Sequence, residues 1–400
     1  MSQGQFTRWA VIASGEGGGR IASQFFSRAE NPGIEDRILV MNTNRNDIRN
    51  TVDRIDAAIT DDADIESTHA LEFGEKQGAG NSYDDGREAA EQDLDRITNR
   101  VKRVFGTADA FLHVATLGGG TGNGSIPYVI DQFKNGLSVG ESEPWMDSVI
   151  HVAMAVWPFY WEPDQRHFNA VCGLSRLLKV LDGGQNADMV ILAANSQLDD
   201  GGSRQDYDGV NEMIIEAIDL MIGAGRETHG VIDIEDYVTI PSRYGSYHFT
   251  PAVATGMDGN IYELEYMFDK AAENPFVPMD VATSQIVFPV VRAPESMIEN
   301  GEITEPEVYR TFNEWQNKHD LSIAGQASLT PKRGRGSDVD VLLLLGGFDL
   351  TPLLDHSMDQ HQQVQENLAR GAAPGGEGLS ERELQQVMEN LEEYRDHNEG

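Results

Sequence analysis

The chain has 400 residues, more than one ordinary domain needs, and this length favours two domains and a tail. It carries 66 acidic against 30 basic side chains, and its formal net charge of −36 excludes binding to nucleic-acid backbones, which requires clustered Lys and Arg. Because such self-repulsion is tolerable near molar salt, where the Debye length is roughly 3 Å, we interpret the scattered acids as a halophilic surface rather than that of an ordinary acidic protein.

Residues 1–14 lack the basic start and the long apolar segment of a signal peptide, so we predict none. No apolar run reaches the ~18 residues that a transmembrane helix needs, so we predict no transmembrane segment. Cys172 is the single cysteine, which excludes an internal disulfide and fits a cytoplasmic protein.

The first half of the chain alternates apolar runs with segments whose apolar residues recur at helical spacing. The runs predict buried strands at 8–14, 37–42, 110–116, 148–157 and 189–195. The helical spacing predicts helices at 87–105, 166–181 and from about Tyr207 to Ile222. Strands that alternate with helices indicate a parallel sheet covered on both faces, which binds ligands beyond the carboxyl ends of its strands.

The second half has the pattern of a smaller mixed α/β domain. Apolar runs at 284–293 and 338–347 flank a helix predicted near 305–319. Polarity rises beyond Thr351, and the glycine-rich stretch 371–378 is typical of a linker. We therefore divide the chain into an N-terminal domain at 1–205, a central helix at 206–226, a second domain at 227–349 and an acidic tail at 350–400.

Five glycines lie within the nine residues from Leu117 to Ser125, directly after the strand predicted at 110–116. Glycines let a backbone approach a phosphate closely, and consecutive N–H groups at a helix start bind its negative charge. A tight turn alone would need one or two glycines, and a Walker P-loop would need a lysine that this stretch lacks. The stretch therefore predicts a phosphate site, in which alanines at Gly120 and Gly122 would push Cβ atoms into the phosphate position.

A second glycine-rich stretch, Gly15–Arg20, follows the first predicted strand. Its spacing, Gly17-x-Gly19-x-x-Ala22, also satisfies the fingerprint of dinucleotide-binding proteins, so an NAD(P)-dependent oxidoreductase stays an alternative. That alternative expects an Asp or Glu at the end of the second strand, where this chain has Asn42, and it gives the other glycine-rich stretch no role.

Taken together, the two glycine-rich stretches resemble those of the tubulin/FtsZ superfamily of GTPases. The family signature Gly-Gly-Gly-Thr-Gly-Ser/Thr-Gly is matched by Gly118–Gly124, with Asn123 in the variable position. Further segments similar to the family follow in order over roughly residues 9–350. They are GEGGGRI (15–21), NTN (42–44), GAGN (78–81), PFYWEPDQRHFNA (158–170) and AN (194–195).

Two features indicate the subtype. Tyr207 and Asn211, one helical turn apart, resemble tubulin, where FtsZ proteins carry Phe and Asp. GEGGGRI resembles the corresponding segment of the haloarchaeal CetZ branch, and the acidic surface agrees with that source. The chain is therefore similar to a divergent haloarchaeal member, CetZ-like or an unclassified FtsZ-like relative.

The resemblance implies an α/β fold in which a parallel-sheet GTP-binding domain is joined by the central helix to a smaller mixed α/β activation domain. It implies GTP or GDP as the ligand, together with Mg²⁺, and it allows K⁺. The binding residues that it carries over are Gly15, Glu16, Gly17, Gly18, Gly19, Arg20, Asn44, Gly118, Gly119, Gly120, Thr121, Gly122, Asn123, Gly124, Glu162, Arg166, Asn195, Tyr207 and Asn211. Gly118–Gly124 would hold the α- and β-phosphates, and Gly15–Gly19 would close the opposite side. Glu16 stands where the family usually has Gln or Gly, and its carboxylate would either help to hold Mg²⁺ or repel the nucleotide.

The base and ribose receive their own residues in this resemblance. Glu162 and Asn195 face ribose and base, Asn211 meets the edge of guanine, and Tyr207 stacks on the ring. Arg166 either offers a planar fork to ribose or phosphate or is a plain surface residue. Without the resemblance, Tyr207 and Asn211 would be an ordinary buried aromatic and an exposed amide on one helix.

The family also completes hydrolysis with a loop after the central helix, which reaches the nucleotide of the neighbouring subunit. Residues 230–238 supply Asp233 and Asp236 at the family's spacing, with Glu235 as a further acid, while Val231 stands where Asn is expected. The two carboxylates keep the pair that activates water, and the missing Asn predicts slow hydrolysis. An acidic turn without a catalytic role stays the alternative.

Since the acids of each subunit would complete the site of the next, the resemblance implies a head-to-tail contact of the chain with itself that repeats into a filament. The expected role is in cell shape, division or positioning, in the cytoplasm or beneath the cell membrane. Other tubulin/FtsZ-family proteins are further expected partners. A pseudo-GTPase that binds nucleotide and acts as a regulator or scaffold with little turnover is the second interpretation.

The tail ends in a predicted amphipathic helix. Ser380-x-x-Glu383 forms a capping box ahead of an apolar stripe. The stripe consists of Leu384, Val387, Met388 and Leu391. It either docks into the groove of a tail-binding partner, as tails of superfamily relatives often do, or folds back on the body of its own chain.

Overall fold

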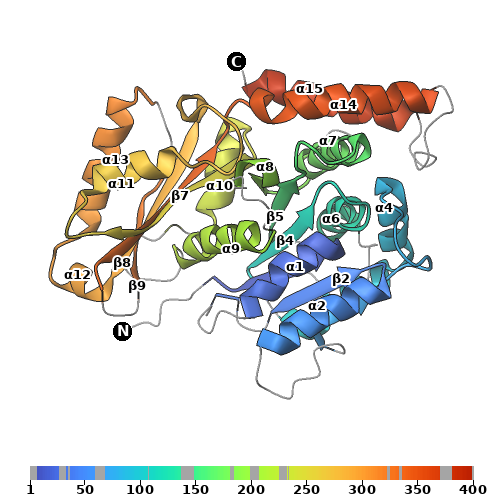
Figure 1. Cartoon of the computed structure of the whole chain (residues 1–400), viewed down its shortest axis with the longest axis horizontal. Coiled ribbons are helices and arrows are strands. Elements are labelled where there is room, and N and C mark those ends of the chain that lie inside the picture. Colours follow the sequence, from blue (N-terminus) through green and yellow to red (C-terminus); the bar gives the residue numbers. More distant parts are fainter. Residues whose placement is uncertain are drawn as a thin grey trace.

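The computed structural model describes residues 7–26, 33–34, 37–58, 68–106, 108–136, 148–180, 184–198, 207–224, 232, 234–321, 325–332, 336–369 and 381–398. Within these residues ten strands form one sheet in the order β3-β2-β1-β4-β5-β6-β7-β10-β8-β9 (Figure 1). Pairing is parallel from β3 to β7 and antiparallel on both sides of β10.

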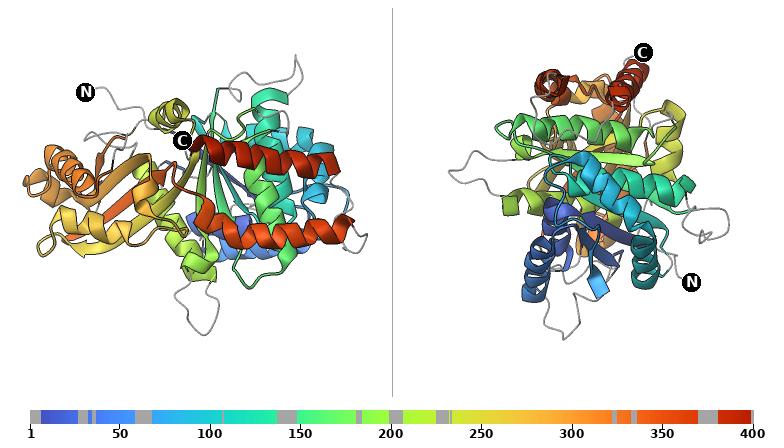
Figure 2. Two further views of the ribbon diagram at one scale, coloured as in Figure 1. Left: turned by 90° about the horizontal axis from the view of Figure 1, so that it is seen from above. Right: turned by 90° about the vertical axis from the view of Figure 1, so that its right-hand side faces the viewer.

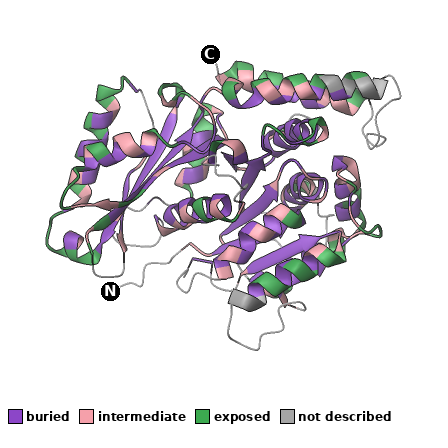
Figure 3. Ribbon diagram, viewed as in Figure 1, coloured by how far each residue is buried: buried purple, intermediate pink, exposed green. Residues whose placement is uncertain are grey.

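Six parallel strands form the first part of the sheet, and their nearly continuous apolar sequences fit burial on both faces. They are β1 (Trp9–Ser14), β2 (Ile38–Asn42), β3 (Ala70–Glu72), β4 (Ala110–Thr116), β5 (Ile150–Trp157) and β6 (Met189–Ala194). Five of them lie within two residues of the strands predicted from the sequence, whereas β3 is too short to give an apolar run. Figure 3 shows these strands buried along their length.

Helices cover both faces of these strands, so the expected two-sided arrangement is confirmed. One face is covered by α1 (Gly15–Phe26), α2 (Arg45–Ala58) and the central helix α9 (Tyr207–Gly223). The other is covered by α4 (Tyr83–Gln92), α5 (Leu94–Phe105), α6 (Thr121–Asp131) and α7 (Asp164–Leu178). A short π-helix, Gln132–Gly136, continues α6, and α8 (Asn195–Leu198) continues β6.

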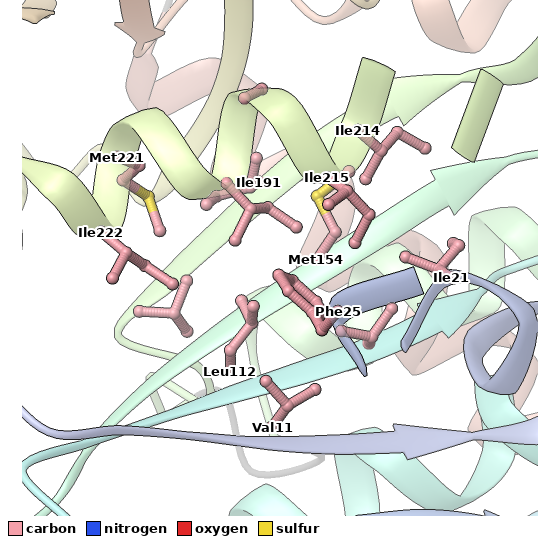
Figure 4. Close-up of a cluster of buried hydrophobic side chains, with 14 of the residues drawn as sticks. Val11, Ile21, Phe25, Leu112, Met154, Ile191, Ile214, Ile215, Met221 and Ile222 are labelled. Carbon is pink, nitrogen blue, oxygen red and sulfur yellow. The ribbon is translucent and has the colours of Figure 1, made fainter. Parts of the chain in front are cut away.

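Alternation along each strand supplies the two hydrophobic clusters. In β1, Val11 belongs to the cluster under α1 and α9, while its neighbour Ile12 belongs to the cluster under α5 and α6. Figure 4 shows the first of these clusters, in which Phe25 of α1 and Ile215 of α9 lie over Met154 of β5. The central helix is therefore part of the core and not a free connection.

The helix expected at 87–105 is divided in two, because Asp93 separates α4 from α5. The carboxylate of Asp93 accepts a hydrogen bond from the backbone N–H of Gly74 at 2.6 Å and pairs with Arg96 at 2.7 Å. These contacts hold Asp93 outside helical geometry, with φ −112° and ψ 19°. Apolar spacing continues through the break, which explains why the sequence pattern does not reveal it.

The second part of the sheet is mixed and is continuous with the first. It contains β7 (His248–Asp258), β8 (Ile286–Pro294), β9 (Ser328–Lys332) and β10 (Asp338–Gly346). Its helices are α10 (Asp236–Tyr244), α11 (Leu264–Ala272), a 3₁₀ turn at Val281–Thr283, α12 (Glu295–Glu299) and α13 (Glu305–Lys318). The junction is narrow, because β6 and β7 pair only through Val190 with His248 and Ile191 with Phe249.

A buried ionic cluster joins the central helix to the second part of the sheet. Arg292 of β8 contacts Glu216 and Asp219 of α9, the latter at 2.6 Å, and Asp340 of β10 at 3.0 Å. Lys332 of β9 also reaches Asp340, at 2.8 Å. Since the Arg292 side chain is 16% exposed and that of Asp340 is 2% exposed, water screens this cluster weakly.

The tail forms two helices, α14 (Thr351–Ala369) and α15 (Glu381–Asn398), which run side by side across α7 (Figure 2). Val387 and Leu391 of the apolar stripe are buried against the body, and the backbone oxygen of Val387 accepts a hydrogen bond from Ser175 at 2.7 Å. The structure therefore shows the second of the two expected arrangements, in which the stripe folds back on its own chain. The linker 371–378 and Ser380 lie outside the described residues.

None of the helices in the described part of the chain is long and apolar enough to cross a membrane.

Candidate functional site

A cavity of about 480 Å³ lies at the carboxyl ends of the parallel strands, where a sheet of this kind offers room for a ligand. The structure brings together there most residues predicted from the sequence. Those that line the cavity are Gly15, Glu16, Gly17, Arg20, Asn44, Gly118, Gly119, Gly120, Thr121, Gly122, Glu162, Arg166, Asn195, Tyr207 and Asn211.

The glycine-rich stretch after β4 forms one wall and is tied to its neighbours by side chains. The hydroxyls of Thr43 and Thr121 lie 2.8 Å apart, which joins the loop after β2 to the start of α6. Asn169 of α7 donates one amide group to the backbone oxygens of Gly118 at 3.0 Å and Asn81 at 2.9 Å. Sequence reasoning gave Asn169 no role; its place in the segment PFYWEPDQRHFNA was the available signal.

The expectation for alanines at Gly120 and Gly122 is wrong. A Cβ atom added at Gly120 would meet the backbone of Ser82 at 2.6 Å, and one added at Gly122 would collide with the backbone oxygen of Ser14. Both glycines line the cavity, but a Cβ atom added at either would point at protein backbone and not into the cavity. Gly119 differs, because a Cβ atom there has open space around it.

Four further predicted residues do not line the cavity; they are Gly18, Gly19, Asn123 and Gly124. A Cβ atom at Gly18 would meet the backbone oxygen of Val114 at 2.5 Å, and one at Gly124 would collide with that of Tyr83. Asn123 is fully buried and donates to the backbone oxygen of Asn169 at 2.6 Å. These residues let α1 and α6 pack closely against their neighbours, so their glycines serve packing.

The other wall, at the start of α1, carries charges. Gly15 adopts a φ of +78°, which favours glycine, and turns the chain from β1 into the helix. Glu16 and Arg20, one turn apart, form an ion pair at the cavity. Asp47 lies nearby, and its pKa is raised by burial and by the negative charge of Glu16.

Sequence reasoning missed several lining residues. Asp47 follows β2 and Thr116 ends β4, while Asn42 and the loop Gly78 to Asn81, which resembles the family's loop near the γ-phosphate, were not among the predicted binding residues. Asn42, Asp47 and Thr116 share a position at or after the carboxyl end of a predicted strand, whereas Gly78 to Asn81 follow β3, which the sequence does not predict. Val156 and Pro158, at the end of β5, complete the lining.

The residues 158–163, here called the cavity loop, connect β5 to α7. Glu162 is 6% exposed, and its carboxylate accepts a hydrogen bond from Phe159 N–H at 3.0 Å and pairs with Arg166 at 2.6 Å. The backbone N–H of Tyr160 donates to the hydroxyl of Ser196, at 2.8 Å, next to the lining residue Asn195. Arg166 therefore holds Glu162 in this structure. This contact is neither the fork to ribose or phosphate nor the plain surface residue expected from the sequence.

The start of the central helix forms the far side of the cavity. Tyr207 and Asn211 are one turn apart, so both can face the cavity. The Tyr207 ring meets Phe159 edge-on, with centroids 5.3 Å apart, and burial followed by the charge of Glu162 raises its pKa. Asn211 is largely buried and offers an amide, which both donates and accepts hydrogen bonds.

The predicted acids lie elsewhere. Asp236 begins α10, beyond the opposite end of the central helix, and its carboxylate lies 3.4 Å from the amide nitrogen of Gln326. It does not line the cavity. Asp233 and Val231 lie outside the described residues. Among the residues that the structure describes, no group of three or more His, Cys, Asp or Glu side chains is arranged to hold a metal ion.

Comparisons with known proteins identify relatives of the chain. The family model "Tubulin/FtsZ family, GTPase domain" matches residues 8–201. The tubulin-like protein CetZ of Pyrococcus furiosus is 24% identical over 279 residues, which are 66% of this chain and 68% of that protein. Other CetZ relatives align over a smaller share; the alignment covers 51% of CetZ1 of Haloferax volcanii.

Solved structures share the fold. CetZ1 from Haloferax volcanii, as a GDP-bound monomer, has a TM-score of 0.71 at 20% identity and is matched over 90% of this chain and 100% of its own. CetZ2 from the same organism, as a GTPγS-bound protofilament, has a TM-score of 0.69 at 19% identity, over 92% of this chain and 100% of its own.

Proposed function

The chain belongs to the tubulin/FtsZ superfamily, and we propose that it is a CetZ-like cytoskeletal GTPase that binds GTP in the cavity and assembles head to tail. The observation that carries this proposal is the meeting of both glycine-rich stretches with Asn211 around one cavity. Family membership leaves the oxidoreductase alternative without support. A role in cell shape, division or positioning, in the cytoplasm or beneath the membrane, accompanies the proposal.

In this proposal each wall of the cavity binds a different part of the nucleotide. Backbone N–H groups of Gly118–Gly122 hold the phosphates from the start of α6, where the helix dipole also favours negative charge. Asn211 recognises the edge of guanine and Tyr207 packs on its ring, while Glu162 and Asn195 face the ribose and base. The proposal for Tyr207 is supported by its edge contact with Phe159, which fixes the ring.

Mg²⁺ would bind with the nucleotide. The ion usually takes one or two carboxylates, with phosphate oxygens and water completing six ligands. Glu16 and Asp47 supply two carboxylates at the charged wall, where burial and, after it, the negative charge of Glu16 raise the pKa of Asp47. Such a pair of carboxylates favours a cation, so these residues fit Mg²⁺. Without the ion, Arg20 offsets the charge of Glu16. K⁺ has no comparable support.

Hydrolysis would require a second subunit. Asp236 lies beyond the far end of the central helix from the cavity, so Asp236 would reach the phosphates only of a neighbour stacked head to tail. The GTPγS-bound protofilament of CetZ2 supports such stacking for that protein. Asp236 would then position and polarise the attacking water, together with Asp233. The acidic surface supports operation in high salt.

The test is the identity of the bound nucleotide. Protein purified in molar KCl should release GTP or GDP when denatured, as identified by chromatography, and should sediment with GTP but not with GDP. Asn211→Ala should lose the preference for guanine over adenine nucleotides, whereas Gly336→Ala, at an exposed turn with open space for a methyl group, should keep it. Retention of only adenine or nicotinamide nucleotides would contradict the proposal.

One observation favours the pseudo-GTPase as the second candidate. Val231 replaces the Asn that the family carries in its catalytic loop. Phosphate release in molar KCl separates the two: GTP that stays bound without turnover at any protein concentration identifies the pseudo-GTPase. A measurable rate identifies the GTPase.

A further inference from the structure

The tail helix α14 contacts residues on both sides of the cavity loop. The indole N–H of Trp157, the last residue of β5, donates to the hydroxyl of Ser357 at 2.9 Å. The same hydroxyl forms a hydrogen bond of 2.9 Å with Nδ1 of His167, in the first turn of α7. All three side chains are at most 1% exposed, so one buried hydroxyl joins the residues before and after the cavity loop.

A second contact reaches the middle of the loop. Nε2 of His356 lies 3.2 Å from the backbone oxygen of Tyr160, and its ring meets the rings of Tyr160 and His167 edge-on, at centroid distances of 5.2 and 4.9 Å. Neighbouring residues of α14 therefore contact the residue before the loop, the middle of the loop and the first turn of the helix after it. Figure 2 shows α14 lying across α7 on the outside of the molecule.

The inner side of the same loop faces the cavity. Pro158, Glu162 and Arg166 line it, and Phe159 supports Tyr207 from the side. The loop is short, and Glu162 is bonded both to Phe159 within the loop and to Arg166 in the first turn of α7. A displacement at Trp157 or His167 would therefore move side chains that face the cavity.

We propose that α14 is a positioning element of the nucleotide site and that Ser357 is its positioning residue, which holds the cavity loop without touching the ligand. This rests on the proposed function for the ligand, but the contacts do not depend on it. Loss of the hydroxyl leaves the buried N–H of Trp157 without its acceptor, a change that costs far more than loss of a contact exposed to water. The loop then relaxes, and the nucleotide is held less well.

The variant Ser357→Ala tests this by hydrogen exchange and by nucleotide binding. In full-length protein at molar KCl, we expect faster amide exchange in residues 159–167 and a GDP dissociation constant raised roughly tenfold. His356→Phe keeps an aromatic ring but loses the hydrogen bond to Tyr160, so we expect a smaller change in the same residues. It also keeps the test valid should Ser357→Ala fail to fold.

Val364→Ala is the matched control. Val364 lies on the same helix and packs with Phe168 and Cys172, without a hydrogen bond to the cavity loop. It should lower the melting temperature but leave loop exchange and GDP binding unchanged. Equal effects of Val364→Ala and Ser357→Ala on GDP binding would overturn the inference, as would unchanged loop exchange in Ser357→Ala. Faster loop exchange in a protein that binds no guanine nucleotide would support the inference and refute the proposed function.

Discussion

The two ends of the central helix differ in what one subunit can build around them. At its start, Tyr207 and Asn211 face a cavity whose walls all come from the same chain. Beyond its end, Asp236 begins α10 outside that cavity, and the Arg292 cluster holds the helix to the second part of the sheet. A helix of 17 residues spans about 25 Å, so Asp236 cannot meet the binding groups of its own subunit.

The cluster at the end of the helix gives the largest expected effect. Arg292→Gln leaves the carboxylates of Glu216, Asp219 and Asp340 without their shared cation in a weakly screened place. We expect the free energy of unfolding to fall by about 3 kcal/mol, measured by denaturant titration in molar KCl. Arg310→Gln is the control. The Arg310 side chain is exposed and pairs with Glu314 of the same helix, so its loss should change the free energy of unfolding by less than about 1 kcal/mol. Equal effects would mean that the ionic cluster adds little to the attachment of the central helix to the second part of the sheet.

The separation of Asp236 from the cavity of its own subunit is tested by measuring the rate of GTP hydrolysis. Asp236→Ala should keep GTP bound and lower phosphate release about 10²-fold, because a positioned general base is lost. Glu299→Ala, an exposed acid of α12, should leave the rate unchanged. In wild-type protein the rate per subunit should rise steeply with protein concentration. A rate per subunit that stays constant from dilute to concentrated protein would place the whole reaction within one subunit.

Two glycines of one wall sharpen the comparison at the cavity end. Gly124→Ala forces a Cβ atom against the backbone of Tyr83 and should cost about 2 kcal/mol of stability. Gly119→Ala has open space and should leave the melting temperature unchanged while weakening nucleotide retention. Thermal unfolding and nucleotide chromatography on the same samples decide this. The reverse pattern would mean that the wall is assigned to the wrong glycines.

The smallest expected effect concerns pH at the junction between the two parts of the sheet, where His248 pairs with Val190. Burial lowers the pKa of His248, at the start of β7, to about 4, while its ring is held by Tyr394 and the backbone oxygen of Phe348. The unfolded chain therefore takes up this proton first, and stability falls as pH drops below about 6.5 and levels off below about 4. From pH 7.5 to 5, the contribution of His248 to the free energy of unfolding falls by about 2 kcal/mol. His248→Gln should show a smaller loss over that range, and parallel curves would contradict the prediction.

The sequence predicts the parts of the fold that have one uninterrupted pattern. The parallel strands are buried on both faces, so each is a plain apolar run with clear ends. β7 escapes prediction because Pro251 interrupts its sequence and its far end, at Gly256, is exposed. The break at Asp93 depends on Gly74, a residue distant in sequence, and no local pattern contains that contact.

The candidate site shows the same limit. The glycine-rich stretches identify the walls of the cavity, yet they do not tell which glycines face a ligand and which face backbone. Gly119 and Gly120 are adjacent and identical in sequence terms, but their Cβ directions differ, and only the packed structure separates them. The contact of Ser357 with Trp157 is equally invisible, since a serine in a polar tail carries no signal of burial.

That last contact joins residues 200 positions apart, and it sets an order of events during synthesis. A ribosome adds roughly 5–20 residues per second, so the cavity loop emerges about 10–40 s before the serine that holds it. The sheet and both glycine-rich walls can form in that interval, while the loop waits for the tail. If the cavity binds nucleotide as proposed, the nucleotide site of a nascent chain would be completed last, and polymerisation that depends on bound nucleotide would be delayed until translation is nearly finished.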